Sequence, residues 1–273
     1  MTIKTADAEE KTYWNPTKGL QVASEMFALL ILNQPLPDIA VVNRLWQHSR
    51  FKICADGGAN RLYDAFRNSG SSDQSEFIPD EVCGDLDSIR PEVQAFYEGK
   101  GVTITRVVSQ YATDFAKCLS RIVDVNSHKC PPGEDEAPPT TVLVLGGLGG
   151  RVDQAFSQIQ HLFGANQDPR YSGWQIMLFS ERSISFVLHK GRNDVRTVLT
   201  EGYLTENIGI IPVGRPAVIS TLGLEWDVRE WQTEFGGQIS TSNHIKCDAI
   251  QIHTNERVLL TLEREEVLPP CRS

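Results

Sequence analysis

The chain contains 273 residues, of which 40% are hydrophobic and 22% are charged, and its formal net charge is −9 at pH 7. This length and composition can supply the core of one large or two ordinary domains, and they exclude a chain that is disordered overall. The negative charge argues against a binding surface for nucleic acid or for an anionic membrane. It leaves room for a small phosphorylated ligand, because a bound metal ion can reverse the charge locally.

The N-terminus and the cysteines indicate the cellular compartment. Residues 1–12 are polar and of mixed charge, and the longest early apolar run, residues 26–32, is far too short to span a bilayer. The six cysteines form no CxxC pair and have no histidine at metal-ligand spacing. We therefore expect a soluble, cytoplasmic protein without a secretion signal, whose thiols are reduced and mostly buried.

Up to about residue 168, short apolar runs alternate with amphipathic stretches, which is the pattern of an α/β domain. We expect strands at 26–32 and 51–55, within 79–88, and at 102–108 and 140–145. Helices are expected at 39–46, 60–66, 91–97 and 113–123, the last with Thr113 as its N-cap. A fifth helix follows residue 150, with an apolar face made of Val152, Ala155, Phe156, Ile159, Leu162 and Phe163.

From Trp174 onward no strong helical pattern remains. Short β-like runs are expected at 175–179, 183–188, 195–199, 208–213, 217–221, 238–240, 249–253 and 258–262. Regular short strands separated by turn residues favour an antiparallel sandwich or barrel. The sequence therefore predicts an N-terminal extension (1–25), an α/β domain with a mostly parallel, Rossmann-like sheet (26–168) and an all-β sandwich domain (174–273). Residues 69–75 and the proline-rich acidic stretch 129–139 are expected to be exposed loops.

Carboxylates follow several of the predicted strands. Asp56 follows the strand at 51–55, Asp85 and Asp87 follow the strand within 79–88, and Asp114 opens the next helix. Asp85 and Asp87 would repel each other unless a divalent cation lies between them. Ligands bind at the carboxyl edge of open α/β sheets, and Mg²⁺ is typically held by one or two carboxylates plus substrate phosphates. The alternatives are ordinary turn chemistry for Asp56, Asp85 and Asp87, and a favourable interaction with the helix dipole for Asp114.

A glycine-rich loop at residues 146–150 lies between a strand and a helix, where backbone N–H groups can approach phosphate oxygens. Its spacing matches neither a dinucleotide fingerprint nor a P-loop. Arg151 then places a cation against the helix dipole, which favours an anion such as phosphate bound nearby. Asp153 has three interpretations: a partner for the Arg151 guanidinium, a group near the metal, or an ordinary N-terminal acid.

Five motifs, in this order, resemble the thiamine pyrophosphokinase family over the chain from about residue 26. They are Asp56-Gly57-Gly58-Ala59-Asn60, Gly84-Asp85-Leu86-Asp87-Ser88, Thr113-Asp114-Phe115-x-Lys117, Gly146-Gly147-x-Gly149-Gly150-Arg151-x-Asp153 and Ser240-Thr241-Ser242-Asn243. The resemblance implies a Mg²⁺-dependent enzyme that transfers the β,γ-diphosphate of ATP to the hydroxyl of thiamine and releases AMP. It also implies a homodimer whose active sites are shared between the two subunits.

The resemblance further implies roles for individual residues. Metal ligands would be Asp56, Asp85, Asp87 and Asp114, and the catalytic candidates are Asp87, Asp114 and Arg151. Nucleotide-binding candidates are Asp56, Gly57, Gln110, Thr113, Lys117, Arg151 and Asp153, and thiamine-binding candidates are Gln110, Trp226, Ser240 and Asn243. The sequence does not choose between Asp87 and Asp114 as acceptor of the hydroxyl proton. Trp226 offers an aromatic face to the thiazolium cation, with a tryptophan of the sandwich core as the alternative.

The chain departs from the family pattern at two positions. Tyr111 stands where the family often has an acid, and Gln154 stands where it often has a histidine. Neither departure removes a residue assigned to metal binding. Two other classes of function stay open at this point: a pterin-type pyrophosphokinase, and a protein that binds thiamine or a nucleotide without turnover.

Overall fold

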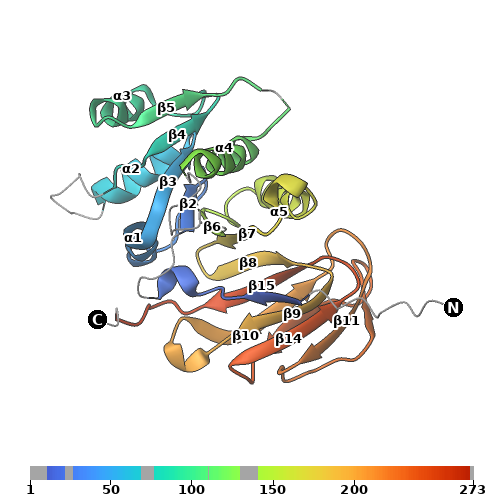
Figure 1. Cartoon of the computed structure of the whole chain (residues 1–273). Helices are drawn as coiled ribbons and strands as arrows, with labels where there is room; N and C mark the ends of the chain where they lie inside the picture. Colours follow the sequence, from blue (N-terminus) through green and yellow to red (C-terminus); the bar gives the residue numbers. More distant parts are fainter. Residues whose placement is uncertain (1–10, 22–26, 69–76, 110, 130–140, 271–273) are drawn as a thin grey trace. The chain divides into compact units, whose positions relative to one another are not determined.

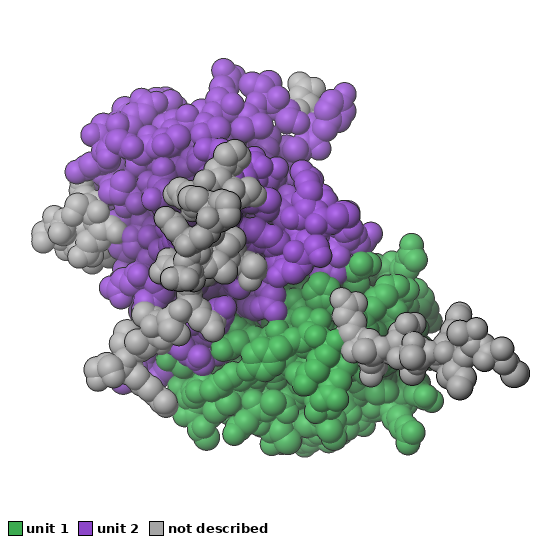
Figure 2. Space-filling model, viewed as in Figure 1, with its two compact units in different colours: residues 1–16, 185–265 green, residues 17–184, 266–273 purple. Residues whose placement is uncertain are grey.

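The computed structural model describes residues 11–21, 27–68, 77–109, 111–129 and 141–270. The chain divides into two compact units, which Figure 2 colours separately. Residues 17–184 and 266–273 form what we call the α/β unit, and residues 1–16 and 185–265 form the β unit. Gln110, the predicted loop at 69–75 and residues 130–139 of the predicted acidic loop lie outside the described residues.

The sheet of the α/β unit is entirely parallel. Its strand order is β7-β6-β2-β3-β4-β5. The strands are β2 (Phe27–Ile31), β3 (Ser49–Ala55), β4 (Glu81–Gly84), β5 (Thr103–Arg106), β6 (Thr141–Leu145) and β7 (Gln175–Phe179). All residues of β2 and β6 are buried, as expected for the uninterrupted apolar runs of central parallel strands.

The helices of this unit cover both faces of the sheet. They are α1 (Ile39–His48), α2 (Gly58–Asn68), α3 (Pro91–Gly99), α4 (Asp114–Lys129) and α5 (Val152–Ala165), with short 3₁₀ turns at Lys18–Leu20 and Pro169–Tyr171. From β2 to β5 the chain moves one way across the sheet, and from β5 it returns to β6 and β7. Because such crossovers are right-handed, α1, α2 and α3 cover one face, while α4 and α5 cover the other (Figure 1). The order in which the chain adds strands to the sheet therefore changes direction between β2 and β6.

Local signals in the sequence explain where the helices begin. Asp38 caps α1, because its carboxylate accepts a hydrogen bond from the Ala40 N–H at 2.7 Å. Pro91 occupies the first turn of α3, where its missing N–H has no cost. No helix in the described part of the chain is long and apolar enough to cross a membrane.

The β unit contains two groups of strands. One sheet has the order β1-β9-β14-β11-β12, and the strands β13, β10, β15 and β8 are neighbours in that order. The bounds are β1 (Lys11–Trp14), β8 (Ser183–Leu188), β9 (Gly191–Arg196), β10 (Leu204–Ile211), β11 (Ala217–Leu222), β12 (Trp231–Thr233), β13 (Ser240–His244), β14 (Ala249–Thr254) and β15 (Val258–Arg264). Buried residues alternate along β14, the pattern of a sheet packed on one face. The predicted fold class, an α/β unit with a parallel sheet plus a β-rich unit, is confirmed.

The unit boundaries differ from those expected from the sequence. The division falls at residue 184 instead of near 170, because β7 pairs in parallel with β6 and so extends the α/β sheet. Residues after 265 return to the α/β unit, where the Arg44 guanidinium donates to the Pro269 carbonyl at 2.7 Å. Among the strands, β12 was not predicted, and the run expected at 195–199 begins earlier, at Gly191, and ends at Arg196.

The predicted N-terminal extension contains a strand of the β unit. Residues 11–14 form β1, which pairs in parallel with β9. Trp14 anchors this strand: it is 1% exposed, its Nε1–H donates to Asn193 Oδ1 at 3.0 Å, and its ring lies 4.7 Å from that of Phe186. Residues 11–14 are therefore part of a unit whose other strands come from residues after 182.

We expect Trp14→Ala to lower the free energy of unfolding by about 3–5 kcal/mol, the range for replacing a large buried aromatic residue. Chemical denaturation followed by circular dichroism measures this change. Tyr13→Ala is the matched control, since Tyr13 is 57% exposed and its replacement should have little effect. Equal losses in the two variants would contradict the anchoring role of Trp14.

Candidate active site

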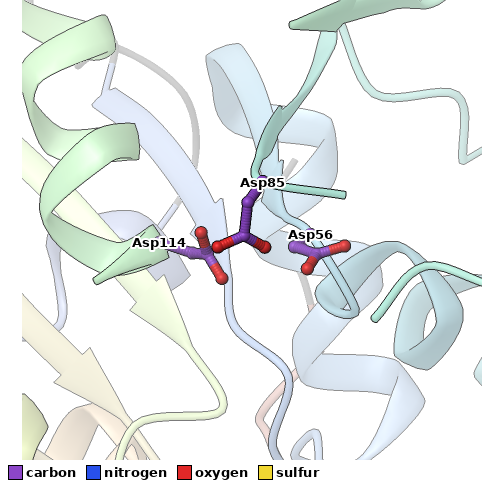
Figure 3. Close-up of side chains that lie close together, drawn as sticks. All are labelled: Asp56, Asp85 and Asp114. Atoms are coloured by element: carbon purple, nitrogen blue, oxygen red, sulfur yellow. The ribbon is translucent and has the colours of Figure 1, made fainter. Parts of the chain in front are cut away.

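Three carboxylates converge at the carboxyl edge of the α/β sheet. Asp56 directly follows β3, Asp85 directly follows β4, and Asp114 is the first residue of α4. Each contributes one oxygen, and these three oxygens lie within 4.8 Å of one another. Figure 3 shows the Asp85 carboxylate between the other two. The strand ends thus bring acids that are far apart in sequence to one point, which we call the carboxylate cluster.

Asp56 also ties two turns together. Its φ of 42° is left-handed, and its carboxylate accepts hydrogen bonds from the backbone N–H groups of Ser88 (3.1 Å) and Ile89 (2.8 Å). Asn60 adds a second link, because its side chain donates to the Ser88 carbonyl (2.8 Å) and accepts from the Arg90 N–H (3.0 Å). The motifs around Asp56 and Asp85 therefore hold each other in place.

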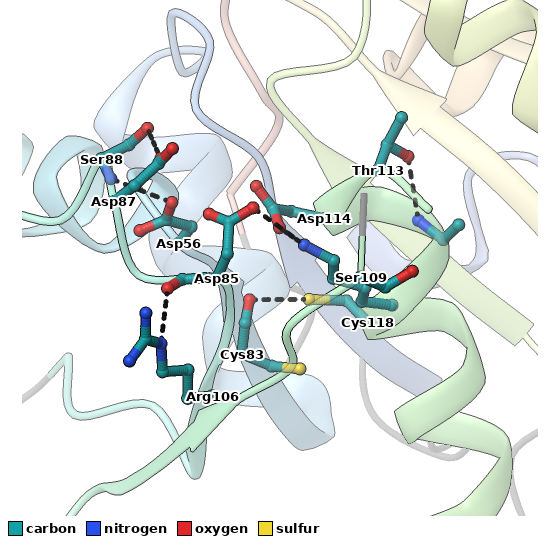
Figure 4. Close-up of polar contacts among 12 residues, drawn as sticks. Asp56, Cys83, Asp85, Asp87, Ser88, Arg106, Ser109, Thr113, Asp114 and Cys118 are labelled. Atoms are coloured by element: carbon teal, nitrogen blue, oxygen red, sulfur yellow. Dashed lines mark hydrogen bonds and ion pairs between the residues drawn. The ribbon is translucent and has the colours of Figure 1, made fainter. Parts of the chain in front are cut away.

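Lys117 supplies the positive charge of the cluster. Its Nζ donates to Asp85 Oδ2 at 3.1 Å and to Asp114 Oδ1 at 2.8 Å, and its side chain is 2% exposed. Figure 4 shows the two accepting carboxylates, Asp85 and Asp114, side by side. Burial lowers the pKa of Lys117, but the hydrogen bonds to the two carboxylates outweigh it, so the pKa is raised overall. The hydrogen bond from Lys117 in turn lowers the pKa of Asp85. Lys117 is therefore charged and holds two of the three acids.

The remaining negative charge fits a hard cation. Burial raises the pKa of Asp56, and the neighbouring Asp114 and Asp87 carboxylates raise it further, against the opposing effect of its two backbone hydrogen bonds. Asp85 Oδ1 is buried and has no hydrogen-bond partner among the described residues. A ligand set made only of carboxylate oxygens, one of them unsatisfied, suits Mg²⁺. The cluster can therefore hold a cation of this kind.

Gly84 provides the space in which the acids meet. A Cβ atom at this position would lie 2.7 Å from Asp56 Cβ and 3.0 Å from Asp114 Oδ1. Both distances are shorter than van der Waals contact, so a side chain here would push the carboxylates apart. The requirement for glycine comes from this close approach, since Gly84 is not among the residues with positive φ.

Two of the predicted catalytic residues lie outside the carboxylate cluster. Asp87 is exposed and accepts a hydrogen bond from the Ser88 hydroxyl at 2.8 Å. Arg151 is the N-cap residue of α5, and its guanidinium donates two hydrogen bonds, of 3.1 and 2.6 Å, to Asp153. Both side chains of this pair are exposed, at 73% and 62%. Of the three interpretations of Asp153, the structure therefore shows the partner of Arg151.

A cavity of about 290 Å³ adjoins the cluster at Asp114. Its lining comes from the turn after β2, from the ends of the strands that carry the acids, and from α4 and α5: Leu32, Asn33, Gln34, Ala55, Gly57, Ser88, Thr113, Asp114, Phe115, Gln154, Ser157, Gln158 and His161. The volume is at the lower end of those typical of small-molecule sites. The turn after β2 borders the point where the strand order reverses, which is where open α/β sheets bind ligands.

Helix α5 presents a polar face to this cavity, which corrects the predicted orientation of its N-terminal half. Val152 and Phe156, expected in the core, are 70% and 55% exposed. Leu162 and Phe163 in the last turns are buried as expected. The reason is that Ser157, Gln158 and His161 face the cavity, which the exposed Gln154 also lines, so Val152 and Phe156 on the opposite side face outward. Hydrophobic periodicity alone does not distinguish these two orientations.

Thr113 and His161 connect α4 to α5 beside the cavity. The Thr113 hydroxyl lies 2.6 Å from His161 Nε2 and accepts from the Ala116 N–H at 3.3 Å, as expected of the predicted N-cap residue. Burial lowers the pKa of His161, which favours its neutral ring. Sequence analysis did not identify His161, Gln158, Ser157, Asn33 or Gln34. The available signal was the spacing of polar residues at 154, 158 and 161, which puts them on one helical face.

Three of the four predicted thiamine-binding residues, Trp226, Ser240 and Asn243, lie in the β unit, and the fourth, Gln110, lies outside the described residues. Trp226 is 55% exposed, which excludes a tryptophan of the sandwich core. Asn243 is buried, and its amide accepts from the Trp226 N–H at 3.2 Å and donates to the Trp226 carbonyl at 3.0 Å. Ser240 is half-buried at the start of β13, and the Trp226 ring lies 5.1 Å from that of His244. Asn243 therefore holds Trp226 in an exposed position.

Acids gathered around one lysine at the strand ends, beside a cavity, are typical of enzymes that transfer phosphate-containing groups, where positioning and charge neutralisation dominate. Comparison with known proteins agrees. The family model "Thiamin pyrophosphokinase, catalytic domain" matches residues 42–172, and "Thiamin pyrophosphokinase, vitamin B1 binding domain" matches residues 195–259. The chain belongs to the thiamin pyrophosphokinase family of enzymes, which confirms the resemblance indicated by its motifs.

Individual relatives are similar over nearly their whole length. Thiamine pyrophosphokinase 2 of Oryza sativa subsp. japonica is 36% identical, with 88% of this chain and 86% of the relative covered. The Saccharomyces cerevisiae enzyme is 28% identical, with 88% and 86% covered. Crystal structures of the yeast enzyme (TM-score 0.79, 27% identity, 97% and 95% covered) and of the Candida albicans protein (TM-score 0.77, 28% identity, 93% of each chain covered) share the fold.

We expect Gly84→Ala to lower kcat/KM of the transferase reaction by roughly a hundredfold, the effect of displacing catalytic groups by about 1 Å. Steady-state assays measure this loss, with circular dichroism to verify folding. Gly99→Ala is the matched control, because a Cβ at Gly99 would meet no atom within 4 Å. An active Gly84→Ala variant would show that the close approach at this glycine is unnecessary.

Lys117→Met should lower the free energy of unfolding by about 2 kcal/mol, between the values for exposed and buried ion pairs. Because the variant leaves the acids without a counter-charge, added Mg²⁺ should raise its unfolding midpoint more than that of the wild type. Denaturation with chelator and with Mg²⁺ measures both effects, and Lys100→Met provides a control at an exposed lysine. An identical response to Mg²⁺ in all three proteins would refute the prediction.

Proposed function

We propose that this chain transfers the β,γ-diphosphate of ATP to the hydroxyl of thiamine, giving thiamine diphosphate and AMP. The observation that carries the proposal is the carboxylate cluster with Lys117 beside the cavity, within the stretch that matches the family's catalytic domain. In such transfers the protein mainly positions the phosphates and neutralises their charge.

Asp56, Asp85 and Asp114 would hold Mg²⁺. When bound, this ion supplies charge neutralisation at the phosphate oxygens and makes phosphorus more open to attack. Lys117 would orient two of the acids and contribute its own charge next to the phosphates. Gly57 and Thr113 line the cavity and are assigned to nucleotide binding. Arg151, paired with Asp153 beside the glycine-rich loop, is assigned to the phosphates, as is Gln110 on the basis of its motif.

Asp87 is the better candidate to accept the proton of the attacking hydroxyl. Asp114 already accepts a hydrogen bond from the Lys117 ammonium group at 2.8 Å, so that oxygen is engaged within the cluster. Asp87 forms no ion pair in the described part of the chain and is exposed. It lies two residues beyond Asp85, at the outer side of the cluster, where a substrate hydroxyl has access.

The β unit would bind thiamine. The exposed ring of Trp226 is suited to a thiazolium cation, since an aromatic face attracts a desolvated cation. Asn243 would act by fixing the backbone of Trp226, while Ser240 would be available for a polar contact. A homodimer with shared active sites and a cytoplasmic location complete the proposal, and both derive from the family resemblance and the composition.

Product analysis tests the proposal directly. Purified protein with Mg-ATP and thiamine should form AMP and thiamine diphosphate in equal amounts, measured by chromatography. Asp85→Asn should reduce the rate by at least about a hundredfold, as expected when an electrostatic contact to the reacting phosphates is lost. Asp168→Asn is a matched control outside the cluster.

The same assay separates the alternatives. Formation of ADP with thiamine monophosphate would indicate single-phosphate transfer, and AMP release with hydroxymethyl-dihydropterin but not with thiamine would indicate a pterin-type enzyme. Binding of thiamine without any product would indicate a protein without turnover. Each of these outcomes would overturn the proposal.

A further inference from the structure

Helix α5 contains a polar stripe in which, within the described residues, only His161 has a polar side-chain partner, the Thr113 hydroxyl at 2.6 Å. Gln154, Gln158 and His161 are spaced i, i+4 and i+7, which places them on one helical face, and all three line the cavity. On the opposite side of the same turns, Val152 and Phe156 are 70% and 55% exposed. A helix that buries the Gln158 amide while Val152 and Phe156 stay exposed stabilises the fold less than the reverse arrangement would. The buried amide beside the cavity therefore points to a ligand.

Gln158 is the residue of this stripe that most requires a ligand. It is only 5% exposed, it lines the cavity, and its Oε1 is buried without a hydrogen-bond partner among the described residues. A buried amide oxygen that has lost water and gained no partner destabilises the protein unless a ligand pairs with it. The partner must present an N–H or O–H group to Gln158.

The position of the cavity indicates which part of a ligand reaches Gln158. At one side the cavity is bordered by Asp114 of the carboxylate cluster, where phosphates would bind through a cation. The α5 side offers amides, a hydroxyl and a histidine whose pKa is lowered by burial, and none of these carries a fixed charge. A nucleotide with its phosphates at the cluster would thus direct its uncharged base or sugar toward α5.

We propose that Gln158 recognises the base of the nucleotide and makes the site selective for adenine. Its Oε1 would accept from the exocyclic 6-amino group, and its Nε2–H would donate to the ring nitrogen N7, the two-point pairing that a glutamine amide forms with adenine. A 6-oxo purine would instead place its O6 acceptor against Oε1, leaving two acceptors face to face. The inference rests on the proposed function in taking the ligand to be a nucleoside triphosphate.

The test compares binding of Mg-ATP and Mg-ITP by isothermal titration calorimetry, because inosine differs from adenosine in its 6-oxo group and N1–H. The wild type should bind Mg-ATP at least about tenfold more tightly than Mg-ITP, the discrimination expected of one good two-point contact. Gln158→Leu should bring this ratio close to one. Gln160→Leu, an identical change at an exposed position of the same helix, should keep the wild-type ratio.

A second measurement needs only the wild-type protein, so that a misfolded variant cannot leave the question open. The triphosphate of purine riboside lacks the 6-amino group, and its affinity should fall below that of Mg-ATP by a similar factor. Equal wild-type affinities for Mg-ATP and Mg-ITP, or an unchanged ratio in folded Gln158→Leu, would overturn the assignment.

Binding is measured without turnover, so this test is independent of product formation. If no thiamine diphosphate forms but the ratio of Mg-ATP to Mg-ITP affinity depends on Gln158, the proposed function is wrong and the inference stands. If thiamine diphosphate forms but the affinity ratio does not depend on Gln158, the proposed function stands and the inference is wrong.

Discussion

Repulsion among the Asp56, Asp85 and Asp114 carboxylates is the constraint on which the rest of the α/β unit depends. Unit charges 4.8 Å apart repel by roughly 3 kcal/mol at the effective dielectric constant of a protein surface. One buried lysine compensates only part of this repulsion. The pKa of Asp56 is raised mainly by burial, and the neighbouring Asp114 and Asp87 carboxylates raise it further. The arrangement is costly for folding, and this cost fits the proposed binding of a cation at the carboxylate cluster.

The protein holds these acids with short connections from rigid elements. The Asp56 carboxylate is fixed by two backbone N–H groups of the neighbouring turn, so it orients that turn whether or not a cation is bound. On the other side, the first turn of α4 supplies three functions at once: Thr113 caps the helix and contacts His161, Asp114 joins the cluster, and Lys117 reaches back to it. Placement on strand ends and one helical turn makes the geometry precise without long loops.

Much of this was predictable because the signals are local. Apolar runs followed by Asp or Gly-Asp mark strand ends, and the carboxyl ends of parallel strands share one edge, so convergence of Asp56, Asp85 and Asp114 follows from the topology. The orientation of α5 was not predictable, since its residues fit either an inward apolar face or an inward polar one. The deciding factor is the cavity, which forms only after β2, α4 and α5 have packed.

Non-local pairing accounts for the other differences. The strand Lys11–Trp14 is too short to be recognised from its own sequence pattern. It is identified by its pairing with β9, which begins at Gly191. Similarly, β7 carries the same apolar signal as the strands after it, and only its parallel pairing with β6 assigns it to the first sheet. For Asn243, the motif indicated importance, but the hydrogen bonds to the Trp226 backbone show that it works through another residue.

The path of the chain between the two units has a consequence for its synthesis. The first 16 residues and residues 185–265 form one unit, while the last residues return to the other. During synthesis β1 emerges from the ribosome long before β9. Trp14 therefore lacks its partner strand while the sheet of the α/β unit is being translated. Contacts of such long sequence separation form slowly. Neither unit is therefore completed by one continuous segment of the chain, and we expect the nascent chain to depend on protection of β1 until β9 has been synthesised.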